Sequence, residues 1–284
     1  MKTILVPTDF SDCANNALNV ALEIAKTAPA EILVVHVLEL AETVYVDYTG
    51  PSVDFSEFLR EQAEQEMMNL KSRVMAKHNI LVKTFTYQSP VHENIVRAAR
   101  DHNADLIVTG TSGAGKLKEK LWGTHTAALI GKSHIPVLAI PKDYKWHKPI
   151  KILLATSHFE KDQVSWEALS GIIGLFAATL HAVVFTDEKK DKAVTSVAHS
   201  WDINRYREFL DQHYGYPVVS EHLYGAGFEQ TLEDYISLND IDMLVMFTYK
   251  RGFLARILDP SKTKRMSCHT RIPLLALAGC RTDF

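Results

Sequence analysis

This chain of 284 residues has few cysteines, little net charge of either sign and no long apolar run. The three cysteines, Cys13, Cys268 and Cys280, are too far apart in sequence for a disulfide framework or a CxxC metal site, which fits a reducing compartment. The 31 basic residues nearly balance the 34 acidic ones, and a net charge of −3 argues against a nucleic-acid footprint and against an acidic disordered chain. No stretch approaches about 18 uncharged apolar residues, and Pro7 and Asp9 interrupt the first apolar run. We therefore expect a cytoplasmic protein with neither a nucleic-acid nor a membrane partner.

The motifs of several common enzyme classes are also missing. There is no HExxH, no GxSxG, and no GxGxxG after the first predicted strand, which disfavours zinc proteases, α/β-hydrolases and dinucleotide oxidoreductases. The 13 histidines show no spacing suited to zinc. A Walker A spacing, Gly110-x4-Gly115-Lys116, ends in Leu117 and so lacks the hydroxyl that holds magnesium in P-loop enzymes. We expect a protein that is not an enzyme, with no catalytic residue and no metal ligand of its own.

Two parts of the sequence occur twice. KTILVPTDF recurs as IKILLATSHF, and DLIVTG…HIPVLAI recurs as DMLVMF…RIPLLAL. The interval from Asp to Pro is 31 residues in both copies, at Asp105–Pro136 and at Asp242–Pro273. A repeat of this length indicates a domain duplication, not a solenoid. We predict two domains, 1–142 and 149–284, joined by a polar linker with proline at each end.

Short apolar runs alternate with helical spacing in the first copy. Helices are expected after the cap residue Ser11, after the glycine-rich loop, and over Glu57–Lys77 and Val91–Asp101. Strands are expected over Thr3–Pro7, Glu31–Leu38, Leu81–Tyr87, Asp105–Thr109 and Pro136–Ile140. This order predicts an α/β fold of two tandem Rossmann-like domains, each a five-stranded parallel sheet with helices on both faces.

The expected ligand site lies where the strand order reverses, at the carboxyl ends of the first and fourth strands. Gly110, Gly113 and Gly123 follow the fourth strand and precede a short helix. Glycine-rich loops turn backbone amides toward anions, and a helix amino terminus favours phosphate. Thr124 and Thr126 offer two further donors, although Thr124 is equally suited to cap the helix. The pattern predicts phosphate binding by this loop.

The glycine spacing resembles that of universal stress proteins of the UspA-like kind, whose signature is Gly-x2-Gly-x9-Gly-[Ser/Thr]. Gly110, Gly113, Gly123 and Thr124 match it without a gap. The opening ILVPTDFS, the strand end HVL and the final strand PVLAI also match the family. The chain therefore looks like a tandem member with the adenine nucleotide alpha hydrolase-like fold, and the resemblance implies a role in the stress response.

The same resemblance implies that the first copy binds ATP, or another adenine nucleotide, together with magnesium. It implies that Asp9, with Pro7 and Thr8 beside it, contacts the nucleoside, and that Val37 contacts the base. The residues that it implies around the phosphates are Gly110, Gly113, Gly123, Thr124 and Thr126. These residue types suit the roles, since a carboxylate accepts hydrogen bonds from ribose hydroxyls and an apolar side chain provides a wall for a base. A nucleotide-free scaffold of the same fold and a slow ATPase stay open as alternatives.

The second copy lacks this signature. The shared 31-residue interval sets Phe247, Lys250 and Pro260 opposite the three glycines, and Ser157 stands opposite Asp9. A proline has no amide to offer, and a lysine or phenylalanine does not readily adopt positive φ. We predict one nucleotide site per chain and a structural role for the second copy.

Each copy ends in a short apolar strand, PVLAI or PLLAL. Such a strand lies at a sheet edge in this topology, and proteins cover or pair exposed apolar edges. Pairing the two strands, with Leu138 and Leu275 at equivalent positions, predicts an internal pseudo-dimer. The resemblance to universal stress proteins, whose single-domain members dimerise in this way, implies the same geometry. A further homodimer, the protein partner and the stress signal are left open.

Overall fold

The computed structural model describes residues 1–39, 53–111, 124–156, 163–187, 218–225, 227–248 and 271–278, with isolated positions between 204 and 215. The strands of the described part form one sheet in the order β3-β2-β1-β4-β5-β10-β9-β6-β7-β8. The elements of the first half are β1 (Thr3–Thr8), α1 (Asp12–Thr27), β2 (Glu31–Leu38), α2 (Val53–Lys77), β3 (Val82–Gln88), α3 (Val91–Asp101), β4 (Leu106–Gly110), α4 (Thr124–Lys132) and β5 (Val137–Ile140). The elements of the second half are β6 (Lys151–Thr156), α5 (Gln163–Phe176), β7 (Thr179–Asp187), β8 (Val218–Gly225), α7 (Phe228–Leu238), β9 (Met243–Phe247) and β10 (Leu274–Leu277).

Each half contributes five parallel strands, and the second half repeats the strand order of the first. The predicted α/β class and the predicted parallel sheet are therefore confirmed. Both α3 and β2 have the predicted bounds, and α2 begins four residues earlier than the periodicity indicated.

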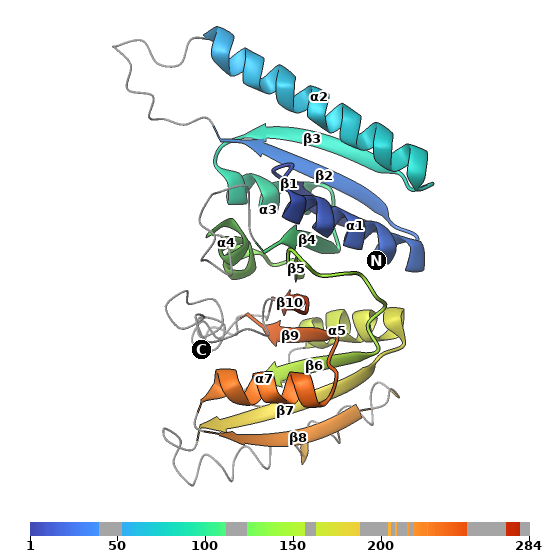
Figure 1. The fold of residues 1–284 in the computed structure, drawn as a ribbon, viewed down its shortest axis with the longest axis vertical. Coiled ribbons are helices and arrows are strands. Elements are labelled where there is room, and N and C mark those ends of the chain that lie inside the picture. The colour runs from blue at the N-terminus through green and yellow to red at the C-terminus, as the bar shows by residue number, and fades with distance from the viewer. Residues whose placement is uncertain are drawn as a thin grey trace, which may run out of the picture.

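The two halves meet along β5 and β10, which pair antiparallel with Leu138 opposite Leu275. Both side chains are buried, at 2% and 1% exposure. The expected pairing of the two final strands is thus present, and it satisfies backbone groups that each half alone would leave at an edge. Figure 1 shows the outer strands of both halves lengthwise and those near the seam foreshortened, as the accumulated twist of a ten-stranded sheet requires.

Helices cover both faces of this sheet, and each face has its own core. On one face, α1, α2 and α5 bury apolar side chains such as Leu22, Leu70 and Trp166. On the other face, α3, α4 and α7 bury side chains such as Ala98 and Leu129. Both cores contain strand residues from the two halves, so the burial of apolar surface stabilises the halves as one unit.

The segment between the halves is held first by α1. The side-chain amide of Asn16 donates hydrogen bonds to three carbonyls of this segment, those of Pro141, Lys142 and Tyr144, at 2.9–3.2 Å. Burial raises the pKa of Tyr144 to about 12, and its hydroxyl donates to the carbonyl of His147. The start of the linker is therefore ordered against the first half.

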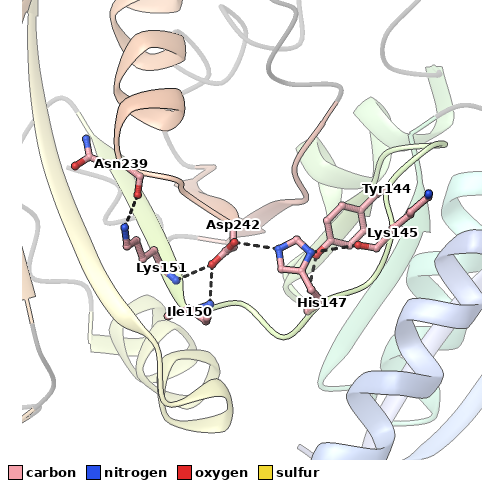
Figure 2. A network of polar contacts seen from close by, with 7 residues as sticks. All are labelled: Tyr144, Lys145, His147, Ile150, Lys151, Asn239 and Asp242. Carbon is pink, nitrogen blue, oxygen red and sulfur yellow. Dashed lines mark hydrogen bonds and ion pairs between the residues drawn. The ribbon is translucent and has the colours of Figure 1, made fainter.

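The end of the linker is held by the second half (Figure 2). Asp242 Oδ2 accepts hydrogen bonds from the amides of Ile150 and Lys151 at 2.7 and 2.9 Å, and Oδ1 contacts His147 Nε2 at 2.9 Å. The first half has an equivalent contact, because Asp105 Oδ2 accepts from the amides at the start of β1. Asp105 and Asp242 are the repeated aspartates of the sequence, and each lies just before the fourth strand of its half. Each thus connects this point to the start of the first strand of the same half.

Candidate functional site

The candidate site lies at the carboxyl ends of β1 and β4. These strands are neighbours, and the chain order reverses between them because β2 and β3 lie on one side and β5 on the other. Pro7 and Thr8 end β1, Asp9 follows it, and Gly110 ends β4. The tertiary structure therefore brings two parts of the sequence, about 100 residues apart, to the topological switch point predicted from the strand order.

Asp9 is exposed within a tight turn that connects β1 to α1. Its Oδ1 accepts a hydrogen bond from the amide of Ser11 at 3.0 Å, and Thr8 Oγ1 accepts one from the amide of Phe10 at 3.0 Å. Ser11 is the N-cap of α1, since its hydroxyl oxygen accepts from the amide of Ala14 at 3.2 Å. Ser11 therefore caps the helix as expected, and Asp9 lies just after the carboxyl end of β1.

Two contacts at this turn, one made by Phe10 of the turn and one by His36 of β2, have no signal in the sequence. Phe10 has φ 61°, an uncommon left-handed conformation for a residue with a bulky side chain, and its ring lies 4.6 Å from that of His36. His36 Nδ1 is 2.8 Å from the Thr8 carbonyl, so it is the donor of this hydrogen bond. The residue type of Phe10 gives no signal of this conformation. The strand end HVL matches the family pattern, but that pattern gives no signal of the contact between its histidine and Thr8.

Val37 lies next to His36 at the end of β2. It is half-buried and packs against the core on the α3 and α4 face. Part of this apolar side chain is therefore accessible at the end of β2, and its contact with a base stays a prediction.

Gly110 has a structural role that the sequence did not suggest. A Cβ built on it would lie 2.7 Å from the Sγ of Cys13 and 3.0 Å from that residue's carbonyl carbon and oxygen. Cys13 is in the first turn of α1, so the helix touches the end of β4 at this point. The glycine is required for this close approach, and its φ is not positive.

Thr126 connects α4 to the same strand end. Its buried hydroxyl donates to the carbonyl of Gly110 at 2.7 Å, so its proton is already used within the protein. Thr124 begins α4, whereas its side chain, Gly113 and Gly123 lie outside the described residues. The exposed His125 contacts Glu39, the residue after β2, at 3.0 Å between Nε2 and Oε1.

The corresponding place in the second half is filled. Phe247 ends β9, is 5% exposed, and packs edge-on against Trp166 of α5 with ring centroids 5.7 Å apart. Gly110 has no side chain, and α1 packs directly against it. At the equivalent position of the second half, the ring of Phe247 packs against α5. Lys250, Pro260 and Ser157 lie outside the described residues.

The described part of the chain shows neither a metal cluster nor a membrane-spanning helix. No group of three or more His, Cys, Asp or Glu side chains in the described part is placed to hold a metal ion. Among the described helices, none is long and apolar enough to cross a membrane.

Comparison with known proteins places this geometry in a family. The model of the universal stress protein family matches residues 1–141. A universal stress protein of Methanocaldococcus jannaschii is 31% identical over 144 residues, which are 51% of this chain and 84% of that protein. One of Thermus aquaticus is 32% identical over 140 residues, 49% of this chain and 98% of that protein.

The arrangement of both halves also has a counterpart among solved structures. The crystal structure of a universal stress protein from Archaeoglobus fulgidus covers 97% of this chain and 98% of its own, with a TM-score of 0.72. The two sequences are 16% identical, so this likeness concerns the fold alone.

Proposed function

The chain belongs to the universal stress protein family, and we propose that its first half binds an adenine nucleotide, ATP with magnesium, as a regulatory ligand. Nucleotide occupancy would then favour one conformation or one protein partner of the chain in the cytoplasm. The second half contributes buried surface to this module through the β5–β10 seam and the shared cores, and its sequence lacks the three loop glycines.

The observation that carries this proposal is the meeting of Asp9, Gly110 and the start of α4 at one switch point. The exposed Asp9 carboxylate has lone pairs to accept hydrogen bonds from ribose hydroxyls. The amino terminus of α4, which Thr126 holds against Gly110, adds a positive dipole end for phosphate. Val37 supplies an apolar side chain at the end of β2, on the far side of β1 from Gly110.

Hydrolysis is not part of the proposal. Phosphoryl transfer to water needs a group that positions the water and groups that stabilise the developing charge. The imidazoles that the described residues place at this edge, His36 and His125, contact Thr8 and Glu39 respectively. Neither has the arrangement of a positioned base, so we propose that turnover is negligible.

Calorimetric titration of the full chain with ATP and magnesium tests the proposal. We expect one site per chain in the wild type and at least about tenfold weaker binding in Asp9→Asn, since charged hydrogen bonds contribute about 1.5–3 kcal/mol. Asp12→Asn is the matched control, because Asp12 is an exposed acid three residues later and lies in the first turn of α1. Two sites, no site, or equal losses in the two variants would contradict the assignment.

The two alternatives have their own readouts. For a nucleotide-free scaffold, denatured preparations would release no adenine nucleotide on ion-exchange chromatography, and titration would give no heat. A slow ATPase would show phosphate release that follows the purified protein and disappears in Asp9→Ala. Gly113→Val, which adds bulk to the predicted phosphate loop, should abolish binding and leave the fold intact.

A further inference from the structure

A cavity separate from the proposed nucleotide site opens at the carboxyl end of the edge strand β3. It has a volume of about 570 Å³ and is bordered by the end of β2, by α2, by the end of β3 and by the start of α3. β1 and β2 lie between this strand and β4 in the sheet. Its volume lies within the range of about 300–1,000 Å³ that is typical of sites for small molecules.

The wall of this cavity is held by hydrogen bonds within the protein. The amide and the hydroxyl of Ser89 both donate to the carbonyl of Leu38, at 2.9 and 3.1 Å. Asn94 is 7% exposed, and its side-chain amide donates to the carbonyls of Gln88 and Pro90 at 2.6 and 2.7 Å. Five residues of the wall thus take part in these hydrogen bonds, and three carbonyls that would repel an anion already have donors.

The cationic groups of the cavity are two arginines from different helices. The guanidinium of Arg97, on α3, lies over the ring of Tyr87 at 5.5 Å from its centroid. The face of an aromatic ring attracts a guanidinium by a cation–π interaction, which does not use its N–H groups as donors to an oxygen. Within the described part of the chain, no carboxylate pairs with Arg97. Arg97 is therefore an exposed cation beside the cavity whose N–H groups can donate to a ligand.

Arg60, on α2, pairs with Glu64 one turn later, at 3.3 Å. Both side chains are more than half exposed, and an exposed pair of this kind is weak enough for a ligand to compete with it. Glu64 is the carboxylate among the lining residues, so the lining has a net positive charge. The start of α3, whose N-cap Pro90 provides no side-chain cap, lies at the rim, and its first turn carries the carboxylate of Glu93, which pairs with His92 and Lys132.

We propose that this cavity binds a small oxyanion, a phosphate or carboxylate group on a metabolite-sized molecule, with Arg97 as its principal charged donor. The planar edge of a guanidinium matches two oxygens of either group in a bidentate arrangement. A cavity of this volume accommodates a small molecule, and the site is independent of whether the first half binds a nucleotide.

Amide NMR spectra of the full chain, titrated at constant ionic strength with inorganic phosphate and separately with succinate, test this proposal. We expect saturable shifts at Ser89, Asn94 and Arg97 with at least one of the two anions. Arg97→Gln should weaken this binding by about tenfold or more, because it removes charge-assisted hydrogen bonds. Arg100→Gln is the control, since Arg100 is exposed on the same helix and does not line the cavity.

The response identifies the chemistry as well as the site. Shifts with phosphate alone indicate a phosphorylated ligand, and shifts with succinate alone indicate a carboxylate. No saturable shift with either anion, shifts confined to the β1 and β4 ends, or equal weakening in the two arginine variants would overturn the proposal. Because Arg97 is outside the proposed nucleotide site, ATP affinity should be the same in both variants.

Discussion

Replacing Gly110 by alanine tests the contact between α1 and β4 directly. The added Cβ would lie 2.7 Å from Cys13 Sγ and 3.0 Å from backbone atoms of the same residue. The sulfur can rotate away, but the backbone carbonyl belongs to the first turn of α1 and moves only with the helix. Overpacking of this kind costs about 1–3 kcal/mol. At about 2 kcal/mol, Gly110→Ala should lower the melting temperature by about 4–8 °C.

The assay is thermal unfolding without nucleotide, so that loss of a ligand does not contribute. Gly171→Ala is the matched control, because Gly171 is exposed in the middle of α5 and an added Cβ would meet nothing within 4 Å. Alanine there should stabilise the protein by up to about 1 kcal/mol through helix propensity. Adding Cys13→Ala to Gly110→Ala should restore part of the loss, because the sulfur contact disappears and the backbone contacts stay.

An unchanged melting temperature in Gly110→Ala would refute this packing of α1 on β4. The glycine would then be explained by ligand contact alone. A loss in Gly110→Ala that appears only in the presence of ATP would lead to the same conclusion.

Three further changes test other parts of the fold. Leu138→Asp and Leu275→Asp each place a charge in the buried seam, and each should lower the melting temperature of both halves together by several degrees. Independent melting of the two halves in the wild type would contradict the seam. Burial lowers the pKa of His181, so the unfolded chain binds a proton on this residue more readily than the folded chain does. Stability is therefore lost as pH falls through about 6.5, the ordinary pKa of histidine. His181→Gln should reduce the fall in melting temperature between about pH 7.5 and about pH 5.5, and an unchanged fall would contradict the burial effect. Asp242→Ala and Asp105→Ala each remove a carboxylate from the start of a first strand and should cost similar amounts, about 1.5–3 kcal/mol by urea unfolding, and a negligible loss in either would refute the equivalence.

The sequence was sufficient for the elements of the first half and their order, and for the second half in outline. Glu31–Leu38 is an apolar run that is buried on both faces, and Val91–Asp101 has apolar residues at helical spacing, so the bounds of β2 and α3 follow from local pattern. The duplication followed from the repeated 31-residue interval, and the topology rules for parallel sheets then placed Asp9 and Gly110 at one edge.

The contacts that define the site depended on the tertiary structure, because they join residues that no local pattern relates. Gly110 was read as a loop glycine, yet the Cys13 backbone 97 positions earlier in the chain is what excludes a side chain there. The contact between His36 and Thr8, and that between Asp242 and His147, arise only when strands pair and the linker packs. The cavity beside β3 is lined by Arg60 and Arg97, which come from two helices on opposite faces of the sheet. Sequence periodicity specifies which side of an element is buried, whereas the residue it meets there is decided by the packing of the whole sheet.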